Sequence, residues 1–235
     1  HLGAEPSPVP AYNSNGLGLI GSAAVGAEAV ERAEEGYHAI KLRLGYPTLD
    51  EDLSAVRAVR DAVGPEIEIL ADYNQVLTPE EAFRRCAALD NQGLGWIEEP
   101  IVHDDYASSA ALARMLTTPV QLGENFLGPH ALRHALAAHA SDLVMFDLQR
   151  IGGVSGWRVA ANLAADAGIP VSSHLFPEVS VHLLAATRTR DRLEMVDWAS
   201  PILEEPLVVR NGMAIPHETP GTGVKWDEQA VALLA

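Results

Sequence analysis

Six short apolar runs that each end in an ionisable residue recur along this chain: EIEILAD (66–72), LGWIEE (94–99), PVQLGE (119–124), DLVMFD (142–147), IPVSSH (169–174) and RLE (192–194). The recurring residues are Asp72, Glu98, Glu124, Asp147, His174 and Glu194, at intervals of 26, 26, 23, 27 and 20 residues. An interval of this length holds one strand, one helix and two loops. Ionisable residues at the ends of successive strands are typical of a (β/α)8 barrel, which builds its active site there.

The remaining sequence supplies the alternation of strands and helices that a barrel needs. Two further strands are predicted before the first of these runs, in VPAYNS (9–14) and HAIKLRL (38–44). The expected helices span residues 23–36, 50–63, 78–91, 104–116, 129–140, 157–167 and 179–186. Eight strands that alternate with helices predict an α/β fold whose parallel sheet closes into a barrel. We expect the barrel to occupy residues 1–199, and an irregular tail over residues 200–235 to pack on it.

The composition of the chain allows one large core and argues against several classes of protein. The chain has 235 residues, 48% of them hydrophobic, and no apolar run long enough for a membrane span. The N-terminal sequence has no signal-peptide pattern, and the single cysteine, Cys86, has no partner for an internal disulfide, so we expect a cytoplasmic protein. A net charge of −16 argues against a nucleic-acid partner, and it requires that a site for an anionic substrate supply local positive charge.

The first three recurring acids, Asp72, Glu98 and Glu124, are candidate metal ligands. Neighbouring strands lie about 4.8 Å apart, so carboxylates at equivalent heights on three adjacent strands would converge and repel one another unless a cation separates them. Oxygen ligands alone favour Mg²⁺, with Mn²⁺ as a substitute. The alternative is that these acids cap the helices that follow. Glu99 competes with Glu98 because adjacent strand residues face opposite ways, and the even spacing favours Glu98.

The other strand ends supply candidates for proton transfer and charge stabilisation. Asp147 on the neighbouring strand would accept the imidazole N–H of His174 and raise its basicity, as in a general base. Lys41 and Arg43 share one face of the second strand, where a desolvated lysine beside a second cation can act as a base and an arginine can bind a carboxylate. Glu194, if protonated, could donate to a developing oxyanion. Each candidate also has a simpler structural interpretation. Asp147 could be a helix cap and His174 a core histidine, Lys41 and Arg43 could form an exposed basic strand end, and Glu194 could be a surface acid.

Several segments that carry these residues are similar to a known family. They are AIKLRLGYP (39–47), LADYNQ (70–75), WIEEP (96–100), LGENFLGP (122–129), DLQRIGGVSGW (147–157) and SSHLFPEVSVHLLAATRT (172–189), followed by LE (193–194). Over about residues 9–195 the chain resembles the C-terminal barrel of the enolase superfamily, and within it the mandelate racemase subgroup. The resemblance implies a (β/α)7β barrel that holds Mg²⁺ on Asp72, Glu98 and Glu124. It also implies that His174, paired with Asp147, is an acid/base catalyst.

The resemblance implies further roles and partners. Glu194 would hydrogen-bond the substrate carboxylate as an enediolate forms, Asn74 would contact the substrate, and Lys41 would neutralise the substrate carboxylate. The shared reaction removes the proton α to the carboxylate of a small hydroxy acid. Members of the family are expected to be homo-oligomers and to carry an N-terminal capping domain, and no segment of this chain corresponds to that domain.

One departure from the family pattern leaves the reaction open. The usual second lysine of the strand-two motif is replaced by Arg43. Racemisation needs a base on each face of the substrate, and arginine is a poor one, whereas dehydration needs only His174. We therefore expect an acid-sugar dehydratase, with a mandelate-type 2-hydroxy acid racemase as the alternative. A catalytically silent metal-binding homologue is a third interpretation.

Three other patterns in the sequence mimic functional motifs. GLGLIG (16–21) has the glycine spacing of a dinucleotide-binding turn and, with Lys41 and Arg43 where an acid would bind ribose, would indicate an NADP-dependent oxidoreductase. That interpretation leaves the strand-end acids unexplained. His130 and His134 lie four residues apart on an expected outer helix and are expected to be surface residues. IGG (151–153) is expected to form a tight turn between strand and helix.

Overall fold

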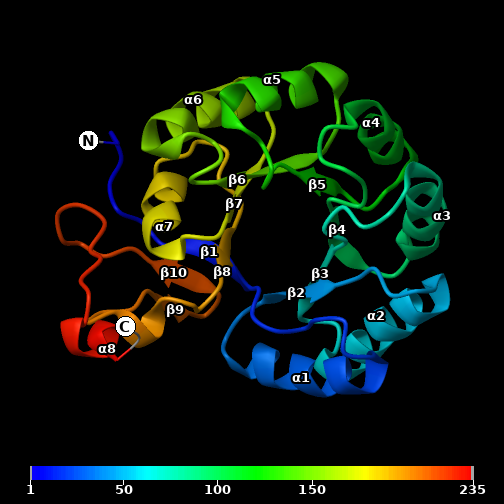
Figure 1. The fold of residues 1–235 in the computed structure, drawn as a ribbon, viewed down its shortest axis with the longest axis horizontal. Coiled ribbons are helices and arrows are strands. Elements are labelled where there is room, and N and C mark those ends of the chain that lie inside the picture. The colour runs from blue at the N-terminus through cyan, green and yellow to red at the C-terminus, as the bar shows by residue number, and fades with distance from the viewer. Residues whose placement is uncertain (1, 234–235) are drawn as a thin grey trace.

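Eight parallel strands form the inner ring of the protein in the computed structural model, which describes residues 2–233 (Figure 1). The strands are β1 (Val9–Asn13), β2 (Ala39–Arg43), β3 (Glu68–Asp72), β4 (Leu94–Glu98), β5 (Val120–Leu122), β6 (Leu143–Asp147), β7 (Val171–His174) and β8 (Leu193–Met195). Each strand from β1 to β7 pairs with the next, and β8 pairs with β1. A parallel bridge between Val171 and Arg190 brings β7 beside the segment that leads into β8, so the ring is closed.

Seven helices surround the strands and lie between them in the sequence, which confirms the expected (β/α)7β barrel. They are α1 (Ser22–Glu34), α2 (Leu49–Val63), α3 (Pro79–Leu89), α4 (Tyr106–Met115), α5 (Gly128–Ala138), α6 (Gly153–Asp166) and α7 (Pro177–Ala185). The sequence around the first turn explains where several of these helices begin. Thr48 and Glu51 form a capping box on α2, and Thr78 caps α3, which has Pro79 in its first turn. The IGG segment forms the expected tight turn, with Gly152 and Gly153 at positive φ, and α6 begins there, four residues earlier than predicted.

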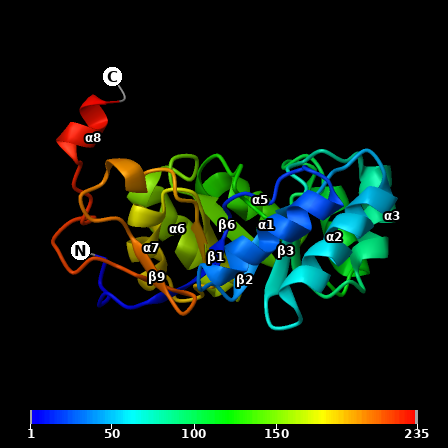
Figure 2. The ribbon, with the colours of Figure 1, turned by 90° about the horizontal axis from the view of Figure 1, so that it is seen from below.

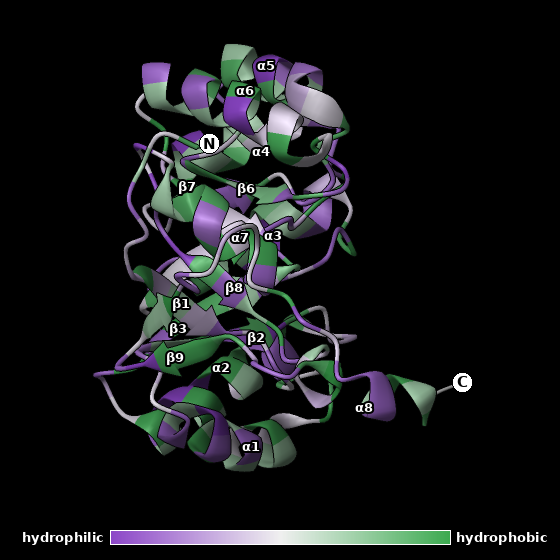
Figure 3. Cartoon of the chain, turned by 90° about the vertical axis from the view of Figure 1, so that its left-hand side faces the viewer, coloured by the Kyte–Doolittle hydropathy of each residue, from purple (hydrophilic) through white to green (hydrophobic). Residues whose placement is uncertain are grey.

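The hydrophobic core has two layers. The larger layer lies between the strands and the helices, and the outer helices accordingly carry alternating hydrophilic and hydrophobic bands (Figure 3). A smaller cluster of Tyr12, Ala39, Leu70 and Trp96 fills part of the barrel interior. Barrels of this kind are filled by side chains, so the active site is confined to the rim at the carboxyl ends of the strands.

The C-terminal segment is more regular than expected. Strands β9 (Val208–Arg210) and β10 (Met213–Ile215) form an antiparallel hairpin, and β10 pairs with β1 outside the barrel ring. The prediction of an irregular tail was wrong there because Asn211-Gly212, both at positive φ, is a strong signal for a two-residue hairpin turn. A short 3-10 turn, Ser200–Ile202, precedes the hairpin, and α8 (Glu228–Ala232) projects away from the barrel (Figure 2).

Within residues 2–233, the structure contains no helix with both the length and the apolar character that crossing a membrane requires.

Candidate active site

The three predicted metal ligands come together at the carboxyl-terminal rim of the barrel. Asp72 and Glu98 end β3 and β4 and lie directly opposite each other in the strand register. One carboxylate oxygen from each of Asp72, Glu98 and Glu124 lies within 4.8 Å of the other two. All three residues are buried, Glu124 slightly less than the others. Three buried carboxylates at this separation form a strongly anionic cluster.

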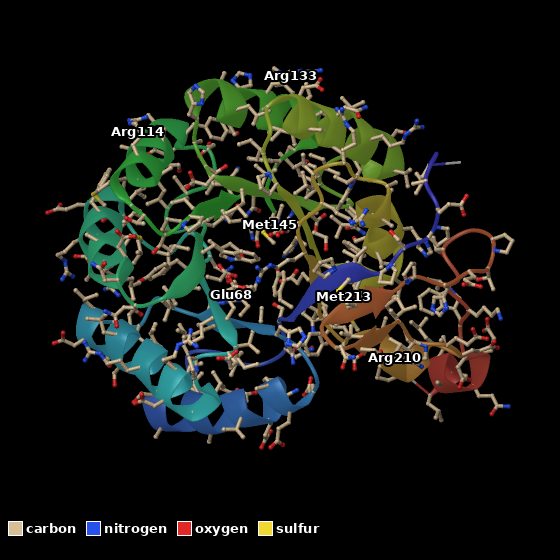
Figure 4. All side chains as sticks on the ribbon, turned by 180° about the vertical axis from the view of Figure 1, so that it is seen from behind. Glu68, Arg114, Arg133, Met145, Arg210 and Met213 are labelled. Atoms are coloured by element: carbon tan, nitrogen blue, oxygen red, sulfur yellow. The ribbon has the colours of Figure 1, made fainter. Side chains whose placement is uncertain are left out.

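Glu124 reaches this cluster by a route that its sequence spacing does not reveal. Glu98 lies opposite Gln121, not Glu124, so the expectation of equal heights on three strands was wrong for the third acid. The chain leaves β5 at Leu122 and turns at Gly123, where φ is +126°. A Cβ atom on Gly123 would lie 2.4 Å from the backbone oxygen of Met145, a residue labelled near the middle of the barrel in Figure 4. Only glycine fits this turn, which carries Glu124 inward.

The charges in this cluster suit a hard divalent cation. Burial and the nearby Asp72 carboxylate raise the pKa of Glu98 well above its usual range. Burial, followed by repulsion from Asp72, raises the pKa of Glu124, although His174 opposes the shift. The donors are oxygens only, which is the ligand set that Mg²⁺ prefers. The residues present therefore fit a magnesium ion.

Lys41 is the cation that lies against these carboxylates in the structure. Its Nζ atom is 3.1 Å from Asp72, 3.3 Å from Glu98 and 2.7 Å from Glu194. Burial alone would lower the pKa of Lys41, but the three carboxylates outweigh it and raise the pKa well above its ordinary value. The depressed pKa that the sequence suggested for Lys41 is therefore not found in this structure. Its neighbours are anions rather than a second cation.

Arg43 lies at the mouth of the barrel, one layer beyond Lys41. It is opposite Asp72 in the parallel ladder, so the two residues share the inward-facing side of the sheet. The side chain is exposed, and within residues 2–233 it has no ion pair. A guanidinium in this position is open to a ligand that enters the mouth.

His174 and Asp147 form the expected pair at the ends of β7 and β6. They lie opposite each other, with Nδ1 of His174 2.9 Å from Oδ2 of Asp147. Asp147 is fixed in turn because its Oδ1 accepts the backbone N–H groups of Gln149 and Arg150, each at 2.9 Å. Although burial opposes ionisation, these hydrogen bonds and the one from His174 lower the pKa of Asp147. The ring is thereby oriented with its other nitrogen toward the acidic cluster.

The outward nitrogen of His174 faces the cluster directly. Its Nε2 atom is 3.3 Å from Oε2 of Glu124. Burial lowers the pKa of His174, but the hydrogen bond with Asp147 and the charges of Glu194 and Glu124 together raise it above 6.5. An imidazole that has a carboxylate on one ring nitrogen and directs the other nitrogen at the acidic cluster has the arrangement of a general base.

Glu194 on β8 is held as a carboxylate. Its Oε1 accepts Lys41 at 2.7 Å and the Ser14 hydroxyl at 2.8 Å, and its Oε2 accepts the backbone N–H of Leu175 at 2.8 Å. Burial would raise the pKa of Glu194, but Lys41, His174 and these hydrogen bonds lower it to about 2. These neighbours stabilise the carboxylate form of Glu194, and the protonated form that would donate to an oxyanion stays a prediction.

Asn74 and Glu99 lie beside the carboxylate cluster. Asn74 donates from Nδ2 to both oxygens of Asp72, at 2.8 and 2.9 Å, so it holds that carboxylate in place. Glu99 turns away from the cluster and accepts Asn125 at 2.7 Å, as expected if Glu98 is the residue that faces the metal. Burial and the charge of Glu124 raise the pKa of Glu99 to about 7.

Sequence reasoning missed three residues that touch the site: Ser14, Trp96 and Asn125. Ser14 follows the first strand in the same way as the recurring acids, and it donates to Glu194. Trp96 stands two positions before Glu98 on the same face and donates to its Oε2 at 3.2 Å. Ser14 and Trp96 could have been found from the sequence, because both lie at or near the end of a predicted strand. Asn125 sits in a loop, and its contacts with Glu99 and Glu124 depend on the turn at Gly123.

Two of the patterns that mimic other motifs take ordinary structural roles. In the glycine-rich loop, the Glu28 carboxylate accepts the N–H of Leu17 at 3.0 Å and lies against Gly16. A carboxylate in that position would repel a phosphate. His130 and His134 lie on the exposed face of α5 with their Nε2 atoms 3.0 Å apart.

Comparison with known proteins places this geometry in a family. A family model described as enolase C-terminal domain-like matches residues 24–230. L-talarate/galactarate dehydratase of Salmonella typhimurium is 34% identical over 231 residues, which are 97% of this chain and 58% of that protein. The chain thus spans little more than half the length of that relative.

Two solved structures are similar over nearly the whole chain. An enolase from alpha pretobacterium bal199 with bound Mg is 47% identical, with a TM-score of 0.96 over 99% of this chain and 65% of that one. An enolase from Bradyrhizobium in complex with magnesium and mandelic acid is 40% identical, with a TM-score of 0.92 over 99% of this chain and 64% of that one. The chain therefore belongs to the enolase C-terminal domain-like family.

Proposed function

We propose that this chain is the catalytic barrel of a Mg²⁺-dependent enzyme that removes the α-proton of a hydroxy acid, as an acid-sugar dehydratase. The observation that carries the proposal is the convergence of Asp72, Glu98 and Glu124 within 4.8 Å, with Nε2 of His174 3.3 Å from Glu124. These acids would hold the ion, which when bound supplies positive charge to the substrate carboxylate as negative charge develops. The Mg-containing structural relatives support the choice of metal.

His174 is proposed to move the proton. Its Nδ1–H donates to Asp147, so Nε2 is the nitrogen that would accept the proton from the carbon α to the carboxylate. In a dehydration the proton on Nε2 then passes to the β-hydroxyl, which leaves as water, and the remaining enol becomes a 2-keto acid. One histidine suffices for both transfers when the α-proton and the β-hydroxyl lie on its face of the substrate.

Lys41, Arg43, Asn74 and Glu194 are proposed to bind and orient the substrate. Lys41 is a fixed cation beside the proposed metal ligands and is suited to the substrate carboxylate. Arg43 at the mouth would bind an outer polar group of an acid sugar. Asn74 would contact the substrate mainly through its side-chain oxygen, because its side-chain nitrogen already donates to Asp72. Glu194 fixes Lys41 in the structure, and it would need to take up a proton before donating to the substrate carboxylate.

Racemisation is the second candidate, and one comparison favours it. The Bradyrhizobium relative, 40% identical, was crystallised with mandelic acid, a 2-hydroxy acid without a β-hydroxyl. The Salmonella relative, 34% identical, is named for dehydration of talarate and galactarate. The guanidinium of Arg43, in place of the usual second lysine, leaves that position without a good base, which supports dehydration.

Proton exchange in D2O tests the proposal. The chain, and any longer natural form of it, is incubated with Mg²⁺ and libraries of acid sugars and aryl hydroxy acids while NMR follows the α-proton. Loss of water to give a 2-keto acid from an acid sugar is the expected result. Exchange with inversion would establish the racemase instead, and no exchange in any substrate despite bound Mg²⁺ would refute enzymatic activity.

The organisation of the whole protein is also a proposal. We propose a catalytic barrel over residues 1–199, a C-terminal segment over residues 200–235 that packs on it, and a capping domain outside this chain. The family resemblance further supports a homo-oligomer that acts on a small hydroxy-carboxylate. Light scattering coupled to gel filtration would measure the number of subunits.

A further inference from the structure

We infer that Trp96 is a positioning residue that makes Glu98 a one-oxygen ligand and thereby favours Mg²⁺ over Ca²⁺ at the site; this inference rests on the proposed function. The indole Nε1–H donates to Oε2 of Glu98 at 3.2 Å, and both side chains are buried. Oε1 of the same carboxylate accepts Lys41 at 3.3 Å. One oxygen of Glu98 is therefore held by an uncharged donor that a metal ion does not replace.

The position of Trp96 is fixed from several sides inside the barrel. Its ring meets Tyr12 edge-on, with centroids 5.3 Å apart and planes at 87°. The guanidinium carbon of Arg192 lies 5.6 Å from the ring centroid, and Arg192 is paired with Glu68, which Figure 4 labels on β3. The pairing of β3 with β4 shifts register between Leu94 and Ile97, the stretch that contains Trp96. The indole N–H therefore has a fixed direction.

A carboxylate with one oxygen occupied discriminates between cations by geometry. Mg²⁺ demands six ligands in a near-ideal octahedron at short distances, and a one-oxygen carboxylate suits it. Ca²⁺ takes six to eight oxygens and often binds both oxygens of one carboxylate. If Trp96 holds Oε2 of Glu98, that oxygen does not bind the metal ion, and Ca²⁺ has one ligand fewer.

The test is Trp96→Phe, with Trp157→Phe as a matched control. Trp157 is equally buried, donates its Nε1–H to Thr187 at 3.1 Å and meets Phe146 edge-on at 5.3 Å, but it lies outside the carboxylate cluster. Mg²⁺ and Ca²⁺ affinities are measured by calorimetry on the full chain, beside the metal-free melting temperature. We expect Trp96→Phe to lose about 10-fold in Mg²⁺ affinity and less in Ca²⁺ affinity, while Trp157→Phe changes neither.

Equal losses for both ions, or no loss in Trp96→Phe, would overturn the inference. An unmodified chain that binds neither ion would instead overturn the proposed function, and this inference with it.

A measurement on the unmodified protein tests the same contact if Trp96→Phe does not fold. With ¹⁵N-labelled indoles, exposed Trp198 and Trp226 exchange fast with solvent, and Trp157→Phe identifies the Trp157 signal. Mg²⁺ should shift the remaining Trp96 signal and leave Trp157 in place; an unmoved Trp96 signal would refute the contact.

Discussion

Replacing Lys41 by methionine should destabilise the metal-free protein and make its stability depend on Mg²⁺. The chain has two lysines, Lys41 and Lys225, which differ completely in environment. Lys41 is buried among Asp72, Glu98 and Glu194, whereas Lys225 is 49% exposed and pairs with Glu205 at 3.2 Å. Methionine keeps the length of the side chain and removes only the charge and the donors.

The magnitude follows from the carboxylate that Lys41 contacts most closely. Burial would raise the pKa of Glu194, but Lys41 lowers it together with His174 and the N–H of Leu175, so that it falls from 4.5 to about 2. Removing one partner of a buried ion pair costs about 3–5 kcal/mol, because the other charge is left buried and unpaired. Since the folded pKa is depressed, this stability is present above pH 4.5 and is lost as pH falls toward 2.

The assay is denaturant unfolding at pH 7 in EDTA and again with Mg²⁺. We expect Lys41→Met to lose about 3 kcal/mol in EDTA and to recover part of it with Mg²⁺, which would neutralise Asp72 and Glu98 but not Glu194. Lys225→Met should lose less than about 1 kcal/mol in either buffer, because exposed pairs contribute little. A Lys41→Met protein as stable in EDTA as Lys225→Met would refute the reasoning.

Three further results are expected. His174→Asn should abolish α-proton exchange and leave Mg²⁺ affinity nearly unchanged by calorimetry; full turnover would show that His174 is not the base, and exposed His134→Asn is the control. Gly123→Ala should lower both stability and Mg²⁺ affinity because its Cβ would press on the Met145 backbone oxygen, whereas Gly221→Ala, also at positive φ but in open space, should lower only stability; equal Mg²⁺ affinities would contradict this. The raised pKa of His174 contributes stability that is full below pH 6.5 and is lost as pH rises through the folded value; unfolding of the metal-free chain from pH 5 to 9 should show this loss, and His174→Asn should remove it.

The strand ends and the candidate ligands were predictable from the sequence because they depend on local rules. Short apolar runs alternate with capped helices, and parallel strands all end at the same rim. Asp72, Glu98, Asp147 and His174 end their strands, so they meet their neighbours by register alone. The hairpin turn at Asn211-Gly212 also follows a local rule, so the sequence could have predicted it.

The charge states and the exact contacts of the site were decided only by the tertiary structure. Lys41 and Glu194 lie 153 positions apart in sequence but 2.7 Å apart in the barrel, and their contact stabilises the charged form of both side chains. Glu124 joins the cluster through a glycine turn packed against β6, and Trp96 gains its partner because the barrel interior fixes its ring. A pKa or a ligand orientation depends on every group around it, so spacing along the chain predicts which residues meet but not how they share their protons and oxygens.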